Sequence, residues 1–519
     1  MNRSIKHLVP LAAILLASLC AACGSSTAIV GPPPPPPTGN FSSASLKGQY
    51  AFSMSGREAC GNIFDSFARA GTFFADGQGH ITGGLEDVNT CGGVATLQFT
   101  SGSYSVAADG RGTLHLTNST GTTNYSVTLS STTQGFIAQT DVNSTASGSF
   151  QRQNPAAFSN PALAAEYVFD FAGVDYSPIP PNPPVPTSII GRFSADGNGG
   201  ISHGLFDANI NGAPSNQQAF PPGAFYQVDT NGDGTTYGRG TANIAGFNYA
   251  FYIVDASRVK FISTAVSAVY QGDAFAQQKI NYDVMSLKGD FAFLIGGSSA
   301  SGAIATAGRF TADGAGTITT VVLDENNSGS ITLLPTGTVT GSYTVDPNLL
   351  GGGTITWTDS KVPGTFSFIF YLISPKEAVF QEIDSGLTSD GTFQAQTAGP
   401  ITPASLAGGF ALAWTGVSSD EEDFVGQLNL TSASGNNASG TMDFNEFGPG
   451  KQFFDIQFKG PLAITAPGTG PNTFSVTTTF PSPRTFNFTA YAVDSNTVFL
   501  VGAESNRVSV IAGSLSRQP

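Results

Sequence analysis

The sequence predicts an all-β protein made of four tandem antiparallel domains, each with about eight strands. Three observations lead to this fold class: a segment that recurs four times, apolar residues at alternate positions within each copy, and glycine-rich turns between the apolar runs. The recurring segment starts at Leu46, Leu163, Leu287 and Leu406, and Tyr or Phe follows each start four residues later. Successive starts lie about 120 residues apart, which is the size of one small domain.

The repeat also sets the domain boundaries. We predict a signal peptide over residues 1–22 and a tether rich in Gly, Ser and Pro over residues 23–41. The four β domains are predicted at residues 42–153, 154–278, 279–398 and 399–519.

Each copy opens with a strand that has one buried face. Tyr50, Phe52 and Met54 alternate with small or polar residues, and the same period of two returns at Tyr167, Phe291 and Phe410. The opposite face, which includes Thr128 in a later strand, is predicted to face solvent. Tight hairpins are expected at Asp-Gly pairs, because glycine supplies the positive φ that such turns need: Asp76-Gly77, Asp196-Gly197 and Asp313-Gly314.

A meander of eight strands can protect its edges by closing into an up-and-down barrel or by folding into a β-sandwich. The connections between strands are short, so neighbours in sequence are expected to pair in space, which favours the barrel. The chain contains 40 Phe and only 2 Trp. We therefore expect barrel interiors filled by side chains rather than open cavities.

The N-terminus has the layout of an export signal. Arg3 and Lys6 precede an apolar run that is too short to span a bilayer, and small residues follow it. The pair Ala22-Cys23 resembles the lipobox of bacterial lipoproteins, although Leu19 lies one place early and Cys20 stands where leucine is usual. By this resemblance Cys23 becomes the lipidated N-terminal residue and the protein is anchored to a membrane of the cell envelope. Plain secretion after ordinary cleavage is the alternative.

Composition excludes one class of partner and predicts one covalent bond. The formal net charge is −15 and no Lys/Arg cluster offsets it, so a nucleic-acid backbone would be repelled. Cys60 and Cys91 both lie in the first repeat, in connections that a meander places at the same end. In an oxidising envelope they are expected to form a disulfide.

An Asp-x-Asn motif closes the third strand of every copy and supplies the candidate binding residues at the loop end: Asp87, Asp207, Asp324 and Asp443. Oxygen atoms two residues apart can share a hard cation, but calcium takes six to eight oxygen ligands. Asx-turn hydrogen bonding explains the motif with fewer assumptions.

A second metal candidate lies in the second repeat at Asp229, Asn231 and Asp233. The spacing resembles the first half of an EF-hand calcium loop, but Gly240 stands where that loop needs glutamate, so an EF-hand is excluded. A weak calcium site in a β-turn remains, and a lengthened hairpin turn is the alternative. No other cofactor is predicted.

Catalytic constellations are missing from the sequence. Outside the signal the chain has only His80, His115 and His203, with no nucleophile elbow, zinc-ligand spacing or Walker loop. The acidic pairs and runs, such as Glu86-Asp87 and Glu421-Glu422-Asp423, are interpreted as solvated loop charge. We therefore predict a protein that is not an enzyme.

The leading functional hypothesis is a lipid-anchored array of β-domains at the envelope or cell surface that acts in binding or adhesion, or as a structural spacer. Four linked modules give avidity for a repetitive partner such as a polysaccharide or another surface protein. The first alternative is a carrier that holds a small apolar ligand inside a barrel. The second is a hydrolase of envelope polymers, which would need clustered carboxylates.

Lipidation at Cys23 can be tested by cell fractionation. In a bacterium with the lipoprotein pathway, the wild-type protein should take up labelled lipid and sediment with membranes, because the modified cysteine is the predicted anchor. Cys23→Ser should release the protein into the soluble fraction, while Cys20→Ser should leave it anchored. Membrane retention of Cys23→Ser together with unlabelled wild-type protein would contradict the prediction.

Overall fold

A computed structural model of the chain describes residues 28–32, 38–61, 63–176, 184–278, 281–397, 399–418, 420–432, 437–448, 450–465, 469–504 and 509–519. The predicted signal peptide and Cys23 lie outside these residues. Strands make up 68% of the structure and helices 4%, so the all-β prediction is confirmed. The short helical segments are η1 (Ser43–Ser45), η2 (Pro155–Ala157), η3 (Asn160–Leu163), α2 (Asp233–Tyr237), η4 (Val284–Ser286) and η5 (Pro347–Leu349).

Each repeat forms its own antiparallel sheet, in which neighbours in sequence pair in space. Barrel 1 consists of β2 (Lys47–Cys60), β3 (Ile63–Asp76), β4 (His80–Thr90), β5 (Gly93–Gln98), β6 (Ser101–Val106), β7 (Arg111–Asn118), β8 (Gly121–Leu129), β9 (Gln134–Gln139) and β10 (Ser144–Arg152). Barrel 2 consists of β11 (Ala165–Asp175), β12 (Val185–Ala195), β13 (Ile201–Ile210), β14 (Ala213–Ala219), β15 (Phe225–Val228), β16 (Arg239–Ile244), β17 (Phe247–Asp255), β18 (Arg258–Ser263) and β19 (Ala268–Ala276).

The second half of the chain repeats this order. Barrel 3 consists of β20 (Lys288–Ser299), β21 (Gly302–Asp313), β22 (Thr317–Asn327), β23 (Ser330–Leu334), β24 (Val339–Asp346), β25 (Gly352–Asp359), β26 (Val362–Ser374), β27 (Glu377–Glu382) and β28 (Leu387–Ala395). Barrel 4 consists of β29 (Gly408–Val417), β30 (Glu421–Leu430), β31 (Ala438–Glu446), β32 (Gln452–Gly460), β33 (Leu462–Ala463), β34 (Asn472–Thr478), β35 (Arg484–Ala492), β36 (Thr497–Gly502) and β37 (Val510–Arg517).

Three of the four sheets close into eight-stranded barrels, which confirms the barrel and rejects the sandwich. The first strand pairs with the last in every repeat: β2 with β10, β11 with β19, β20 with β28 and β29 with β37. Barrel 2 is incomplete. Among the described residues no strand ladder closes its sheet, and an isolated bridge between Gly200, just before β13, and Phe225, at the start of β15, is the one pairing across the gap.

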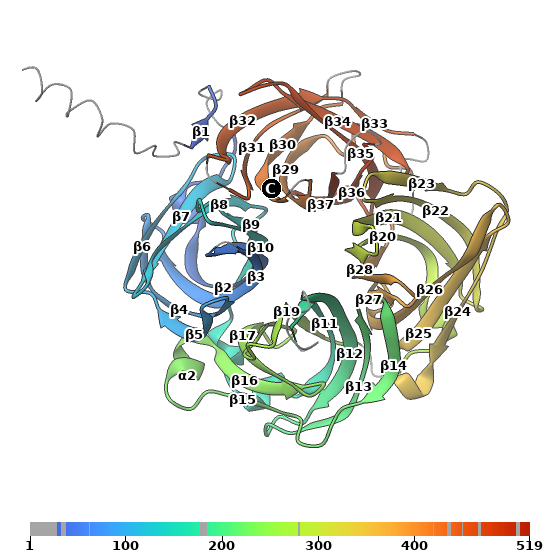
Figure 1. Cartoon of the computed structure of the whole chain (residues 1–519), viewed down its shortest axis with the longest axis horizontal. Coiled ribbons are helices and arrows are strands. Elements are labelled where there is room, and N and C mark those ends of the chain that lie inside the picture. Colours follow the sequence, from blue (N-terminus) through green and yellow to red (C-terminus); the bar gives the residue numbers. More distant parts are fainter. Residues whose placement is uncertain are drawn as a thin grey trace, which may run out of the picture.

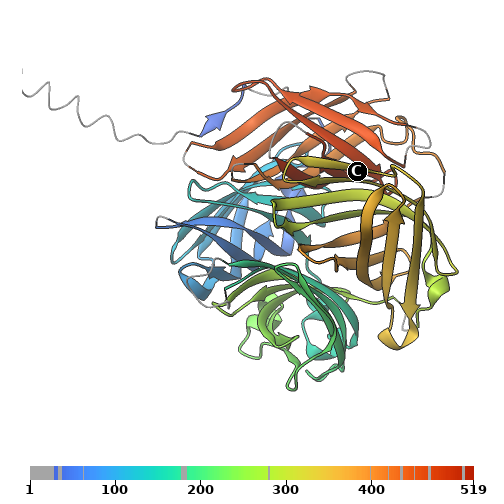
Figure 2. The same cartoon turned by 45° about the vertical axis from the view of Figure 1, so that its right-hand side comes forward.

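The four barrels are arranged in a ring around a central opening (Figure 1). The first and last strands of each barrel lie on the inner side of the ring, and barrel 4 packs against barrel 1 (Figure 1). Each end of the chain contacts the barrel on the other side of this junction. Strand β1 (Ile29–Val30) pairs in parallel with β32 of barrel 4 (Figure 2), while Gln518 donates hydrogen bonds to Asp109 and Leu129 of barrel 1. Both ends therefore hold the ring closed.

The barrel interiors are filled by the alternating aromatic residues, as predicted. Phe52, Phe169, Phe293 and Phe410 are all fully buried. The cavity described inside barrel 2 measures only about 20 Å³, far below the roughly 300–1,000 Å³ of a typical small-molecule site.

The outer faces of several strands are also buried, which corrects one prediction. Thr128 was expected to face solvent, but its side chain is 0% exposed. The periodicity identifies the interior face of a strand correctly. It cannot show that the second face of β8 meets β30 of a barrel some 300 residues later in the chain.

The predicted disulfide is confirmed. Cys60 ends β2 and Cys91 follows β4, and the two sulfur atoms are bonded across a sequence separation of 31 residues. The bond joins two connections at the same end of barrel 1, as the meander requires.

The strand register can be tested by paired alanine substitutions in barrel 3. Phe293→Ala should lower the free energy of unfolding by about 3–5 kcal/mol, because it leaves a cavity in a packed core. Ser342→Ala, on the exposed face of β24, should change it by less than about 0.5 kcal/mol. Chemical denaturation of both variants measures the difference, and equal losses would contradict the register.

Candidate binding site at the centre of the ring

The Asp-x-Asn motif joins each barrel to the next one around the ring. In every copy the asparagine lies at 0–1% exposure, and its Nδ2 atom donates to backbone carbonyl oxygens of the following barrel. The donors and their acceptor residues are Asn89 to Ser263, Ala265 and Ala268; Asn209 to Glu382 and Leu387; Asn326 to Gly502 and Ser509; and Asn445 to Gln139, Asp141 and Ser144. The last set closes the ring.

The aspartates of the motif lie in the same four interfaces. Asp87 accepts a hydrogen bond from the Tyr252 hydroxyl at 2.7 Å, and Asp207 accepts one from Tyr371 at 2.6 Å. Asp324 is bonded by Tyr491, and Asp443 by Ser126 at 2.8 Å. Burial raises the pKa of Asp207, Asp324 and Asp443. The structure thus places one of the sequence-predicted binding candidates in each interface, where a neighbouring hydroxyl group occupies it.

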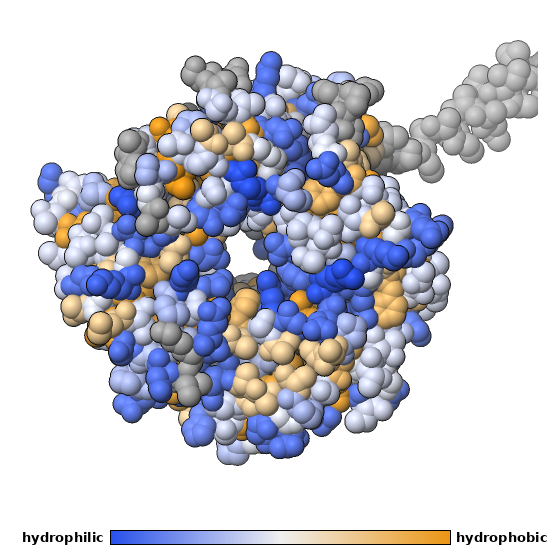
Figure 3. All heavy atoms as spheres, turned by 180° about the vertical axis from the view of Figure 1, so that it is seen from behind, coloured by the Kyte–Doolittle hydropathy of each residue, from blue (hydrophilic) through white to orange (hydrophobic). Residues whose placement is uncertain are grey.

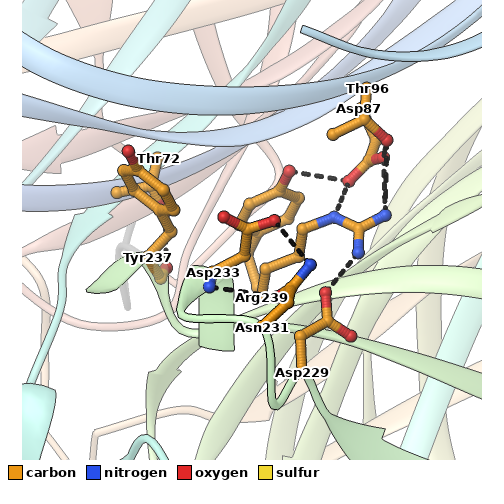
Figure 4. A network of polar contacts seen from close by, with 9 residues as sticks. Thr72, Asp87, Thr96, Asp229, Asn231, Asp233, Tyr237 and Arg239 are labelled. Atoms are coloured by element: carbon orange, nitrogen blue, oxygen red, sulfur yellow. Dashed lines mark hydrogen bonds and ion pairs between the residues drawn. The ribbon is translucent and has the colours of Figure 1, made fainter. Parts of the chain in front are cut away.

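The calcium candidate of the second repeat lies beside the first of these interfaces (Figure 4). Asp229 pairs with Arg239, whose guanidinium group also binds Asp87 at 2.8 and 2.9 Å. Asn231 and Asp233 bond to each other at 3.1 Å, where the short helix α2 begins. The three side chains are therefore engaged in the turn and in the arginine pair. The calcium site itself stays a prediction.

A cavity of about 490 Å³ lies where the inner strands of the four barrels meet. Seen from behind, the opening passes through the ring and hydrophilic residues surround much of it (Figure 3). Barrel 1 contributes a wall of serines, namely Ser53, Ser55, Ser147 and Ser149. The charged lining residues are Asp170, Lys260 and Asp273 from barrel 2, Asp390 from barrel 3 and Glu421 from barrel 4.

Two carboxyl groups face each other across the seam between barrels 2 and 3. Asp170 and Asp390 lie within hydrogen-bonding reach, which requires a proton between them. Burial, reinforced by the neighbouring carboxylate, raises the pKa of Asp170 well above its ordinary value. The Oδ1 atom of Asp170 is buried without a hydrogen-bond partner.

The backbone fixes Asp170 through a close approach of two strands. Gly272 on β19 lies against β11, and a Cβ atom there would stand 1.8 Å from the carbonyl oxygen of Asp170. A glycine recurs at the same pairing in each barrel, at Gly148, Gly391 and Gly513. Any larger residue would push the first and last strands apart and displace the cavity wall.

Lys260 and Asp273 form a buried ion pair in the same cavity wall. The Nζ atom of Lys260 lies 3.4 Å from Asp273 and donates to Ser53 and Ser149 of barrel 1 at 3.1 and 3.2 Å. Burial lowers the pKa of Lys260 to about 8, and the Asp273 charge opposes this shift. Arg258 also pairs with Asp273 and, together with Lys260, lowers the pKa of that carboxyl despite its burial.

The acidic run of the fourth repeat is not the solvated loop charge that the sequence indicated. Glu421, Glu422 and Asp423 begin β30, and Asp423 is fully buried against barrel 1, where it accepts from Thr145 at 2.7 Å. Glu86 and Asp87 are likewise 1% exposed, on β4. Asp87 and Asp423 contact a neighbouring barrel, whereas Glu86 pairs with Arg69 and Glu422 pairs with Arg484 within their own barrels. The sequence interpretation failed because neither set of partners is adjacent in sequence.

The charges in the cavity depart from the repeat. The positions equivalent to Asp170 hold Ser53, Leu294 and Ala413 in the other copies. Lys260 pairs across the sheet with Tyr252, and the residues at that register elsewhere are Phe136, Val379 and Phe499. A charge in one copy, at a position where the other copies have uncharged residues, is the sequence signal that could have identified this site.

The remaining polar candidates lie away from the cavity. His80 is exposed beside Asp76, and His115 bonds Asn124 at 2.8 Å. Among the described residues, the one group of three potential metal ligands is Glu58, Cys60 and Cys91, and both of its sulfur atoms belong to the disulfide. None of the described helices has the length and apolar character that crossing a membrane requires.

We found no match to protein-family models and none to curated proteins. Weak similarity exists to solved structures. A variant of transferrin binding protein B from Haemophilus parasuis Hp5 is 10% identical, covers 74% of this chain and 82% of that one, and has a TM-score of 0.19. A protein of unknown function from Nostoc punctiforme, of the DUF3598 family, is 10% identical over 46% of this chain and all of that one, with a TM-score of 0.15. Similarities at this level support no inference about function.

Stability should fall between pH 5 and pH 8. Burial raises the pKa of Asp423 to about 6 and that of Glu382, inside barrel 3, to about 8, whereas both titrate near pH 4 when unfolded. The folded state then binds more protons, so this stabilisation is complete below about pH 4 and is lost as the pH rises through the folded pKa values. We expect a higher Tm at pH 5 than at pH 8.

Two substitutions check the origin of this pH dependence. Asp423→Asn should reduce the difference in Tm between pH 5 and pH 8, because it removes one of the titrating groups. Asp313→Asn should leave that difference unchanged, because hydrogen bonds from the backbone of its turn lower the pKa of Asp313, so that this carboxyl stays ionised throughout the tested range. A Tm that rises from pH 5 to pH 8 would contradict the assignment.

Proposed function

We propose that this chain is an exported binding protein, anchored at the cell envelope through Cys23, and that its binding site is the central cavity of the ring. The observation that carries the proposal is the cavity of about 490 Å³ to which all four barrels contribute polar or charged side chains. Pockets of 300–1,000 Å³ with a few converging polar groups are typical of small-molecule sites.

The geometry favours this site over the interior of a barrel. A carrier of a small apolar ligand needs an empty barrel, but the four cores are packed with aromatic residues such as Tyr50, Phe169, Phe310 and Trp414. The void of about 20 Å³ inside barrel 2 would not hold such a ligand. Binding between barrels also gives the closed ring a role, because no single repeat can form the site.

The proposal extends the sequence hypothesis of a surface binding array. Four barrels that each bound a partner independently would act by avidity, with equivalent surfaces in each copy. The charges at the centre instead differ from copy to copy, as Asp170 and Lys260 show. One shared site for one ligand fits this asymmetry better than four repeated sites. Polysaccharide and protein partners remain candidates for the outer surface.

Calorimetric titration of the mature, full-length protein tests the site. Three probes of one size and different charge, namely cyclohexylamine, cyclohexanol and cyclohexanecarboxylate, should include at least one that binds with a stoichiometry of one. Ser55→Phe, which places a ring in the cavity, should weaken that binding about tenfold or more. Ser105→Phe, on the exposed face of β6, is the matched control and should bind as the wild type does.

The proposal fails if none of the three probes binds. It also fails if binding survives unchanged in Ser55→Phe while thermal melting shows that the variant is folded.

A further inference from the structure

We propose that the seam between Asp170 and Asp390 is the subsite for a protonated amine, so that the ligand of the central cavity is a small organic cation. This inference rests on the proposed function, because it names the chemical class of the ligand that the cavity would take. Three features of the described residues support it: the facing carboxyl groups, the engagement of nearby cations by other acids, and the size and lining of the cavity.

The first feature is an unbalanced charge. Two carboxylates at hydrogen-bonding distance repel each other strongly inside a protein, and both cannot be ionised unless a positive charge joins them. A shared proton is one way to relieve this repulsion. None of the described residues donates a hydrogen bond to the buried Oδ1 atom of Asp170, which is costly for a polar atom. An ammonium group has three N–H donors and can bond this oxygen and Asp390 together.

The second feature is that the neighbouring cations already have partners. Lys260 and Arg258 both bind Asp273, on the strand next to Asp170. Arg57 lies 3.8 Å from Glu421, at the opposite wall of the cavity. Among the described residues that line the cavity, Lys260 is the one with a positive charge, against four acids. Acidic groups therefore outnumber basic ones in the lining, which disfavours anions.

The third feature distinguishes an organic cation from a bare metal ion. Among the described residues, no third acid, histidine or cysteine lies within 4.8 Å of this pair to complete a metal cluster. The cavity is far larger than an ion, and Phe136, Phe275 and Ala512 line it beside the serines. An amine with a short apolar body matches carboxylates at one end and this mixed wall at the other.

The test compares cyclohexylamine with cyclohexanol, which has similar shape and no charge, on the intact mature protein at pH 7. Cyclohexylamine should bind at least about tenfold more tightly than cyclohexanol. In the isosteric double variant Asp170→Asn/Asp390→Asn the amine should lose about tenfold or more in affinity, while cyclohexanol should bind as it does to the wild type. Asp76→Asn, at an exposed hairpin, should change neither affinity.

Three results would overturn the inference. If cyclohexanol or cyclohexanecarboxylate binds as tightly as the amine and Ser55→Phe abolishes that binding, the cavity is a binding site but not for a cation. If the amine binds equally well to the double variant, the carboxyl pair is not its subsite. If Mg²⁺ or Ca²⁺ alone binds the wild type and not the double variant, and the amine fails to bind, the subsite belongs to a metal ion.

Discussion

The architecture depends on a single repeated contact, in which a buried asparagine donates its amide hydrogens to carbonyl oxygens of the next barrel. Asn89, Asn209 and Asn326 make this contact between barrels that follow each other along the chain, and Asn445 makes it between the last barrel and the first. Because the contact is the same in all four copies, each barrel is rotated relative to its neighbour in a similar way. Four such steps bring the chain back to its start, and the inner strands then enclose a common space.

The sequence predicted the barrels because the forces that form them act within one repeat. The alternation at Tyr50 and Phe52 reports which face of β2 is buried, and the Asp-Gly pairs fix the hairpins. Cys60 and Cys91 could be paired from the strand order alone. Each of these signals depends on residues that are close in sequence or related by a simple meander.

The ring and its central site could not be predicted in the same way. Asp87 carries the sequence signature of a turn or a weak metal ligand, and only the position of Tyr252 and Arg239 on another barrel gives it a different role. Asp170 and Asp390 are separated by 220 positions and meet across an interface that no period in the sequence encodes. The sequence shows that Asp170 departs from the repeat, but its role could be assigned only from the positions of the other barrels in the ring.

The junction between barrels 4 and 1 has a consequence for how the molecule unfolds. The other three interfaces each contain an apolar cluster, such as Val168 and Ile190 against Ile369 and Tyr371. The closing junction instead relies on polar contacts, including Arg111 with Asp455, and on the two chain ends. Such contacts lack the buried apolar area of the other three interfaces, so local opening and hydrogen exchange should begin there. Once this interface opens, barrels 1 and 4 each have a neighbouring barrel on one side only. Unfolding can then start from either of these two barrels, and the four repeats no longer unfold as one cooperative unit.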